Sequence, residues 1–399
     1  MSGPLKNLKV LDLTNVVMGP FATQTLGDLG ADVIKIESPE GDTIRHLGPM
    51  RSPGMSAGFL HLNRNKRSVV INLKEESGRQ SLLGLAERSD IFITNVRPAA
   101  MARLGLDYAA VAARNPSIVY VSMVGYGQSG PYADRAAYDD IIQAVCAIPT
   151  LIAQVGDGVP RYIPLAIVDR VVGQAAATAT LAAVIHRLQT GRGQHVEIPM
   201  FETMVPYVLS EHMSGRTYDP PMGPPGYPRL LAPSRRAYAT LDGYVAALVY
   251  TDRHWKAFFC AIGQPERFKS DPRLATVAQR TAHISDLYSE VSEALKARPT
   301  AYWLETLGAA DIPVMPVHTL DSLLEDPHLK AVKFFRHAEH PTEGSVLDMA
   351  PLGRWSDSEP SIPRPAPSLG QHNDEVLPSS IGETLRPDRA AAHHAHIFK

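Results

Sequence analysis

Asp169 is the residue of this chain best suited to carry out chemistry. It follows the apolar segment 163–168 and precedes the Ala-rich stretch 174–190, whose composition predicts a long helix. An aspartate in this place can cap the helix by accepting a hydrogen bond from a backbone N–H two or three residues further on. The helix dipole would also keep the carboxylate ionised, so that at the ligand edge of a sheet it could act as a nucleophile or a base. The two interpretations are compatible, because capping geometry can also orient a catalytic oxygen.

Basic side chains gather near the expected ends of strands. The run 63–68 (Asn-Arg-Asn-Lys-Arg-Ser) precedes one strand, 94–98 (Thr-Asn-Val-Arg-Pro) follows another, and Arg103 falls in the short helix 99–104. Guanidinium groups bind phosphates bidentately, so such loops suit an anionic ligand. Each charge taken singly is also typical of a solvated surface, but several basic loops around one sheet favour a common anionic ligand.

A glycine-rich stretch and a pair of acids follow a third strand. The glycines of 125–132 (Gly-Tyr-Gly-Gln-Ser-Gly-Pro-Tyr) permit close approach of the backbone to a ligand, and they suit a plain irregular loop equally well. Tyr138, Asp139 and Asp140 open the next predicted helix, where the two carboxylates can serve as caps. Paired acids alone are weak evidence for catalysis.

These residues need a scaffold that brings strand ends together, and the segment 9–42 predicts one. Apolar runs at 10–13 and 33–36 predict two strands, and the stretch between them predicts a helix that ends near Gly30. The pair Gly19-Pro20 is interpreted as a turn at the carboxyl end of the first strand, where open α/β sheets bind ligands. The segment lacks G-x-G-x-x-G, which counts against a dinucleotide.

The same alternation of strands and helices continues to about residue 200 and predicts a mostly parallel sheet covered by helices. A Pro-rich stretch at 219–228 predicts a domain boundary, because proline removes backbone donors and fixes φ. A hairpin around Asp242-Gly243, helices over 252–310 and a return strand at 312–317 predict a smaller α+β domain. The Pro-rich segment 360–367 is expected to run extended over a surface. The further predicted elements are strands at 68–73, 90–94, 118–123 and 195–198 and helices at 75–88 and 108–114.

Composition excludes several classes of protein. The 399 residues carry a net charge of −2, which gives no electrostatic reason to expect a nucleic acid or an anionic membrane as partner. We find neither an apolar run of about 18 residues nor a signal-peptide core, so the protein is expected in the cytoplasm. Cys146 and Cys260 are expected to be buried thiols. Motifs for metal sites are absent, and the histidines at 393, 394 and 396 fall in a tail expected to be disordered.

Taken in order, these motifs resemble those of one known family. The chain resembles the class III coenzyme A transferases, the family of formyl-CoA transferase and carnitine CoA-transferase, over nearly its whole length. Each motif is short, but their order and spacing together are highly specific. The matching segments are 10–42, 65–74, 90–98, 125–131, 168–173, 190–194, 313–317 and the Pro-x-x-Gly-x-His signature at 367–372.

The resemblance implies an architecture and a reaction. It implies a large Rossmann-like CoA-binding domain over 1–220, completed by 331–399, a small domain over 225–330, and a homodimer of two interlocked chains. The family's catalytic aspartate matches Asp169. By the resemblance, this carboxylate attacks a donor thioester to give a mixed anhydride, CoA thiolate then gives an aspartyl-CoA thioester, and an acceptor acid leaves as its CoA ester. No metal or redox cofactor is implied beyond CoA itself as substrate.

The resemblance also implies which residues contact CoA, and it departs from formyl-CoA transferase at two of them. That enzyme has Gln in place of Val17 and Arg in place of Ser38, and its run of glycines over the active site is missing here. These departures count against a small, highly polar acceptor such as oxalate and leave a larger or more apolar acid open. The implied contact residues are Val16, Val17, Ser38, Ile71, Asn72, Leu73, Lys74, Asn95, Val96, Arg97, Arg103, Arg135 and Tyr138.

Two other functions compete with transfer. The α-methylacyl-CoA racemases of the same superfamily share the N-terminal motifs and move an α-proton with a His and the matching Asp. Their His falls at Tyr138, and a phenol, with a reference pKa of about 10, is a poor base at neutral pH. This favours the transferase over the racemase. A non-catalytic CoA-binding protein is the remaining alternative.

Overall fold

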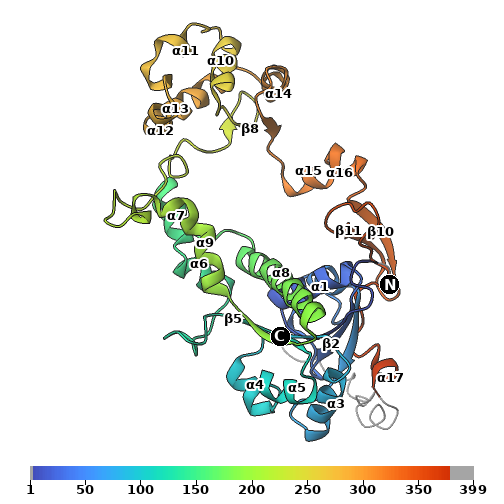
Figure 1. Cartoon of the computed structure of the whole chain (residues 1–399). Helices are drawn as coiled ribbons and strands as arrows, with labels where there is room; N and C mark the ends of the chain where they lie inside the picture. The colour runs from blue at the N-terminus through green and yellow to red at the C-terminus, as the bar shows by residue number, and fades with distance from the viewer. Residues whose placement is uncertain (1–2, 378–399) are drawn as a thin grey trace, which may run out of the picture. The chain divides into compact units, whose positions relative to one another are not determined.

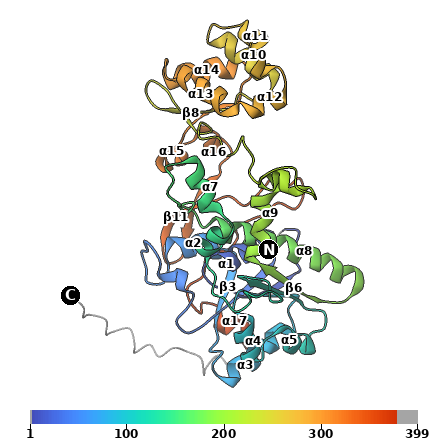
Figure 2. The same ribbon diagram turned by 90° about the vertical axis from the view of Figure 1, so that its left-hand side faces the viewer.

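The computed structural model describes residues 3–377, whose contacts divide into two compact units (Figures 1 and 2). The described part of the first unit comprises 3–146, 163–205 and 333–377, and the second unit comprises Ala147–Tyr162 and Pro206–Val332. This division differs from the predicted domains. Residues 147–162 and 206–220 belong to the second unit, whereas the sequence analysis assigned them to the large domain.

A six-stranded parallel sheet forms the centre of the first unit. Its strand order is β3-β2-β1-β4-β5-β6, so β1 pairs with both β2 and β4, and Leu11 lies opposite Ile34 on one side and Phe92 on the other. The four central strands are almost wholly buried, which explains why they appear in the sequence as short continuous apolar runs. The strands are β1 (Lys9–Leu13), β2 (Asp32–Glu37), β3 (Lys66–Val70), β4 (Ile91–Thr94), β5 (Val119–Val124) and β6 (Gln194–Pro199).

Helices cover both faces of this sheet. Helices α1 and α8 lie on one face, and α3, α4, α5 and α17 lie on the other, in both views (Figures 1 and 2). On the second face, Leu82, Met101 and Val111 pack with Leu11 and Phe92 in one apolar core. The helices of this unit are α1 (Met18–Asp28), α2 (Ala57–Asn63), α3 (Glu76–Ala86), α4 (Pro98–Leu104), α5 (Tyr108–Arg114), α6 (Asp139–Val145), α8 (Ile167–Thr190) and α17 (Asn373–Val376); α9 (Met200–His212) begins here and continues into the second unit.

The predicted turn at Gly19-Pro20 is wrong. Helix α1 begins at Met18, so both residues lie in its first turn, where proline is tolerated because its missing N–H would have no helical partner. The actual turn is the loop 14–17. Gly19 is needed for another reason: Thr14 packs so closely against the start of the helix that a Cβ at Gly19 would lie 2.3 Å from the Thr14 Cβ.

Helix α8 corrects a second expectation. By length and composition its residues Ile167–Thr190 could cross a membrane, contrary to the reported lack of a long apolar run. The helix packs against α1, and Val168, Val172 and Ala176 are buried. Gly173 allows this packing, because a Cβ there would lie 2.7 Å from the carbonyl oxygen of Met18. Helix α8 is therefore a partly buried helix of the core.

The C-terminal segment returns to the first unit. Strands β10 (Phe335–His340) and β11 (Gly344–Met349) form an antiparallel hairpin. The Pro-rich segment 360–367 contains no helix or strand, as predicted. Two hydrogen bonds tie it to the first unit: Asn65 N, just before β3, donates to Arg364 O, and the Arg45 guanidinium donates to Pro367 O. The histidines at 393, 394 and 396 lie outside the described residues.

The second unit is smaller and combines an antiparallel sheet with helices. The predicted hairpin around Asp242-Gly243 is confirmed, and the return strand pairs with it in the order β7-β8-β9. Trp255, Phe258 and Leu287 lie in its apolar core. Cys260 is exposed, which corrects the prediction that both thiols are buried; Cys146 is buried. The strands are β7 (Tyr238–Ala239), β8 (Tyr244–Ala247) and β9 (Val314–Pro316), and the helices are α7 (Ile148–Val155), α10 (Asp252–Ala261), α11 (Arg267–Ser270), α12 (Val277–Ala282), α13 (Ile284–Leu295), α14 (Thr300–Ala309), α15 (Leu320–Leu324) and α16 (Pro327–Ala331).

Candidate active site

A cleft of about 910 Å³ opens at the carboxyl edge of the parallel sheet. The loops that follow β1, β2, β3, β4 and β5 form its wall, which is the place where open α/β sheets bind ligands. Every site residue implied by the family resemblance lines this one cleft, although these residues come from seven separate segments. The lining includes Val16, Val17, Ser38, Ile71, Asn72, Leu73, Lys74, Asn95, Val96, Arg97, Arg103, Arg135, Tyr138 and Asp169.

Asp169 lies in the first turn of α8 and does not cap it. The N-cap residue is Ala166 and makes no side-chain capping bond, so the predicted capping role of Asp169 is wrong. Burial of the carboxyl group, reinforced by the neighbouring Asp139 carboxylate, raises the pKa of Asp169 to about 7, and Arg170 offsets only part of this. Burial thus outweighs the helix dipole, which was expected to keep Asp169 ionised. Near neutral pH this carboxyl group exists in both protonation states.

Asp139 is the residue of the site whose role the sequence analysis missed. It lies in the first turn of α6, and its Oδ2 accepts a hydrogen bond of 2.9 Å from the backbone N–H of Asp169. Its Oδ1 accepts a second bond, of 2.6 Å, from Gln143. The Asp139 carboxylate thus holds the first turn of α8 in place and also keeps a negative charge beside Asp169. Thirty residues separate the two carboxylates, so no local spacing signals the pair.

Four cations that line the cleft have no carboxylate partner within residues 3–377. Lys74, Arg97, Arg103 and Arg135 form no salt bridge with any residue in 3–377, although Arg135 stacks on the Tyr132 ring at 4.3 Å. Their side chains are therefore available to an anionic ligand. The basic loop 94–98 and Arg103 are thus placed as the anionic-ligand prediction requires.

The other basic run does not face the cleft. Lys66 is fully buried, with its Nζ 3.0 Å from the Asp12 carboxylate. Arg64 pairs with Asp28 at 2.7 Å and with Asp348 at 2.8 Å, and Arg67 pairs with Asp32. The prediction that the run 63–68 binds phosphate is therefore wrong, because its cations are used within the fold.

The glycine-rich stretch serves internal packing. A Cβ at Gly125 would lie 2.3 Å from Cβ of Ala137, and a Cβ at Gly127 would lie 2.6 Å from the Glu202 carboxylate. Gly125 and Gln128 also line the cleft, so the stretch forms part of its wall. No group of three or more His, Cys, Asp or Glu residues within 3–377 is arranged to hold a metal ion.

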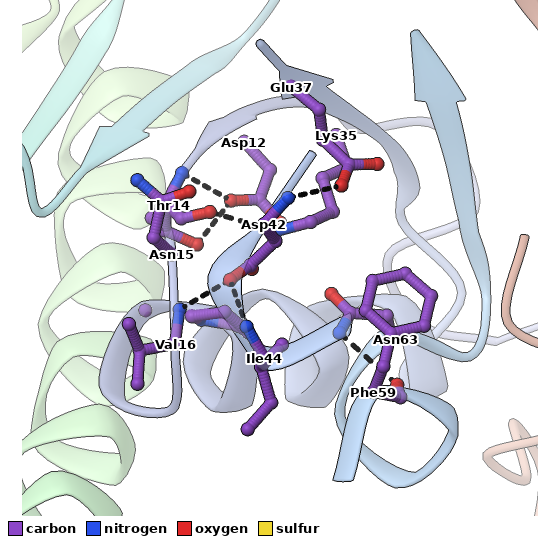
Figure 3. A network of polar contacts seen from close by, with 12 residues as sticks. Asp12, Thr14, Asn15, Val16, Lys35, Glu37, Asp42, Ile44, Phe59 and Asn63 are labelled. Atoms are coloured by element: carbon purple, nitrogen blue, oxygen red, sulfur yellow. Dashed lines mark hydrogen bonds and ion pairs between the residues drawn. The ribbon is translucent and has the colours of Figure 1, made fainter. Parts of the chain in front are cut away.

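A network of buried charges bonds to the loops after β1 and β2 (Figure 3), and both loops line the cleft. Asp42, whose side chain is fully buried, pairs with Lys35 at 2.8 Å and accepts the backbone N–H of Val16 at 3.0 Å. One signal in the sequence could have revealed it: Asp12 and Lys35 are charged residues inside apolar strands, and charges there must be paired. The network joins three carboxylates with three cations, namely Asp12, Glu37 and Asp42 with Lys35, Arg45 and Lys66.

Comparison with known proteins identifies the class to which this fold and cleft belong. The chain belongs to CoA-transferase family III, whose profile matches residues 5–373. The protein is therefore a class III CoA-transferase, an enzyme that acts on acyl-CoA and a carboxylate, as the resemblance implied.

Individual relatives are similar over nearly their full length. A human succinyl-CoA:glutarate CoA-transferase is 30% identical over 98% of this chain and 91% of its own. A formyl-CoA:oxalate CoA-transferase of Streptomyces avermitilis is 32% identical over 96% of both chains. The crystal structure of a CaiB/BaiF family protein from Brucella suis superposes with a TM-score of 0.79 at 31% identity, covering 94% of this chain and 99% of that one.

Proposed function

We propose that the enzyme moves CoA from an acyl-CoA donor to a carboxylic acid acceptor through covalent intermediates on Asp169. The observation that carries this proposal is the position of Asp169, a carboxyl group that titrates near neutral pH in the wall of a cleft lined by unpaired cations. Nucleophilic catalysis by a carboxylate needs only an ionised oxygen beside the bound thioester. Neither a metal nor a redox cofactor enters the reaction.

The steps balance as exchanges at acyl carbon atoms. The Asp169 carboxylate attacks the carbonyl carbon of the donor thioester. The C–S bond breaks, CoA leaves as the thiolate, and the donor acyl group remains on Asp169 as a mixed anhydride. The thiolate attacks the aspartyl carbonyl and releases the donor acid, which leaves an aspartyl-CoA thioester. The acceptor carboxylate then displaces CoA to form a second anhydride, and the thiolate attacks the acceptor acyl group. This last step frees Asp169 and yields the new CoA ester.

The lining of the cleft supports the assignment of CoA to the loops. The phosphates of CoA suit the unpaired side chains of Lys74, Arg97, Arg103 and Arg135. Val16 and Val17 offer apolar surface to the pantetheine chain. We therefore assign the residues predicted from the sequence to CoA contacts and place the thioester at Asp169.

Racemisation is disfavoured by the same lining. No histidine lines the cleft among the described residues, and Tyr138, at the position of the racemase base, is an exposed phenol at the N-terminus of α6. Incubation of a 2-methylacyl-CoA in D₂O without an acceptor acid should leave its α-hydrogen unexchanged. Deuterium uptake under these conditions would contradict the transferase assignment.

The central experiment is the replacement of Asp169 by alanine. Asp169→Ala should abolish transfer between acyl-CoA and an acid, while CoA binds within a few-fold of its wild-type affinity. Mass spectrometry of the wild-type enzyme incubated with acyl-CoA should show a CoA adduct on the peptide that contains Asp169. A variant with wild-type turnover would contradict the mechanism, as would a wild-type enzyme that transfers CoA without ever forming the adduct.

The names of the relatives guide the search for the acceptor. They describe transfer to glutarate, oxalate and mesaconate, all of which are dicarboxylic acids. We propose a screen of succinate, glutarate and oxalate together with larger, more apolar acids, with succinyl-CoA and acetyl-CoA as donors. Both cysteines are free thiols, which fits the proposed cytoplasmic location.

A further inference from the structure

The loop 14–17 adopts a backbone conformation that its own sequence disfavours. Val16 has φ of 69°, in the left-handed region, where a β-branched residue is strained. Glycine, asparagine and aspartate adopt this conformation more readily, but position 16 is a valine. The surrounding structure must therefore hold Val16 in place.

The buried charges supply these restraints. Asp42 accepts the N–H of Val16 at 3.0 Å and the N–H of Ile44 at 3.1 Å, so one carboxylate joins the loop after β1 to the loop after β2 (Figure 3). Lys35, which pairs with the same carboxylate, donates to the carbonyl oxygen of Thr14 at 2.8 Å. The side chains of Asp42 and Lys35 are fully buried and do not line the cleft.

Asn15, between Thr14 and Val16, is held by the loop that follows β4. Asn15 N donates to the Asn95 side chain at 2.9 Å, and Asn95 Nδ2 donates back to Asn15 O at 2.9 Å. Side chains from β2, from the loop after β2 and from the loop after β4 thus fix three successive residues of the loop. Water cannot easily replace these bonds where the partners are buried.

The charge balance favours the ionised pair. Burial by itself would lower the pKa of Lys35, but the carboxylates of Asp42, Asp12 and Glu37 raise it above its ordinary value. Removal of one charge would leave its partner buried and unpaired, which is strongly unfavourable.

The loop also connects the network to Asp169. It leads directly into α1, whose N-cap Val17 makes no side-chain capping bond, so the loop decides where the helix begins. Met18, the first residue of α1, packs against Gly173 of α8, and Arg170 of α8 stacks on the Phe21 ring at 4.8 Å. Asp169 lies one turn before Gly173. A contiguous set of contacts therefore runs from Asp42 to the first turn of α8.

We infer that the Lys35–Asp42 pair positions the acyl-CoA site: it holds Val16 in its strained conformation and thereby fixes the loops 14–17 and 38–43 and the start of α1 against α8. The inference rests on the proposed function, since these loops are the ones assigned to CoA. Asp42 and Lys35 are positioning residues, because neither side chain reaches the cleft.

A double-mutant cycle between Asp42 and Val16 tests this inference in the full chain. Asp42→Asn should weaken CoA binding, measured by calorimetry, roughly tenfold or more, because small displacements of a binding loop have large effects. Glycine adopts a positive φ without strain, so in Val16→Gly the loop no longer needs the Lys35–Asp42 pair to hold this conformation. In that background Asp42→Asn should weaken CoA binding by less than about threefold, because the two residues are in direct contact and their effects should not add.

Two controls separate positioning from general stability. Asp28→Asn removes a carboxylate from another buried pair, with Arg64 at 2.7 Å, which contacts neither loop; it should lower the melting temperature and leave CoA affinity unchanged. Lys35→Met combined with Asp42→Asn removes one charge of each sign, so it should fold even where Asp42→Asn alone does not, and it should still bind CoA weakly.

The possible outcomes are distinct. Wild-type CoA affinity in folded Asp42→Asn or in the charge-balanced double variant would overturn the inference, as would an equal effect of Asp42→Asn in both Val16 backgrounds. A wild-type enzyme that does not bind CoA would overturn the proposed function, and this inference with it. Loss of affinity in Asp42→Asn with normal affinity in Asp28→Asn would support both.

Discussion

At the scale of single residues, Asp139 acts directly on Asp169, whose carboxyl group lines the cleft. The Asp139 carboxylate accepts the backbone N–H of Asp169 while its negative charge adds to the burial that raises the pKa of Asp169 to about 7. A carboxylate of higher pKa is a stronger nucleophile once ionised, but fewer molecules are ionised at a given pH. The pair therefore sets a compromise between reactivity and population near neutral pH.

This compromise predicts a pH dependence. The ionised form of Asp169 is the proposed nucleophile, so kcat/KM should rise as the pH increases through about 7 and level off above it. With a pKa of about 7, roughly one-tenth of the free enzyme is ionised at pH 6. The test is a profile of kcat/KM against pH. It should be recorded at constant ionic strength with a donor that does not titrate in this range.

The variant Asp139→Asn tests the origin of the shift. Asparagine keeps an acceptor for the Asp169 N–H but removes the negative charge, so the pKa of Asp169 should fall and the rising limb of kcat/KM should move to lower pH. Relative activity at pH 6 should consequently increase. Asp140→Asn, one position along the same helix, is the matched control and should leave the limb in place; an unchanged limb in Asp139→Asn would show that Asp139 does not influence Asp169.

At the scale of elements, the contact between α1 and α8 decides where Asp169 lies. Gly173 allows the two helices to approach closely, because a Cβ there would lie 2.7 Å from Met18 O. The elements themselves follow from apolar patterns in the sequence, and helix α5 has the predicted bounds. The start of α8 at Ile167 was not predicted, because the break at Pro164 and the apolar residues that follow do not distinguish an extended segment from a first helical turn.

We expect Gly173→Ala to disturb this contact. The added methyl group must push α1 and α8 apart, and overpacking of this kind typically costs about 1–3 kcal/mol. The melting temperature and kcat should both fall, since the first turn of α8 carries Asp169, the proposed nucleophile. The measurements are thermal unfolding and steady-state kinetics.

Gly84→Ala provides the comparison. Gly84 lies in α3, and a Cβ there would meet no atom within 4 Å. Alanine has the higher helix propensity, so this variant should be as stable as the wild-type enzyme or slightly more stable. Equal melting temperatures and rates for Gly173→Ala and the wild type would contradict the proposed role of the helix contact.

At the scale of the whole molecule, we propose the interlocked homodimer that the family resemblance implies. Several large apolar side chains are exposed in the single chain, including Leu188, which is 75% exposed, and Ile185, which is 55% exposed, both on α8. Exposed apolar residues near one another on a helix are typical of a surface that a partner covers.

The dimer predicts a dependence on concentration. If folding and association are coupled, the melting temperature should rise with protein concentration, because dilution favours the dissociated, unfolded chains. Sedimentation velocity should give the mass of two chains at micromolar concentration. A monomeric mass together with a melting temperature independent of concentration would contradict the proposal.

The sequence by itself determined the mostly parallel sheet covered by helices, and fourteen of the residues that line the cleft. Short apolar runs are a local signal for buried strands, and the motifs that resemble those of the CoA-transferases mark the loops that follow these strands. Only the tertiary structure decided how these residues behave. The raised pKa of Asp169 and the restraint of Val16 depend on desolvation and on charges 30 and 26 positions away along the chain. Such effects act through space, so no local pattern of residues encodes them.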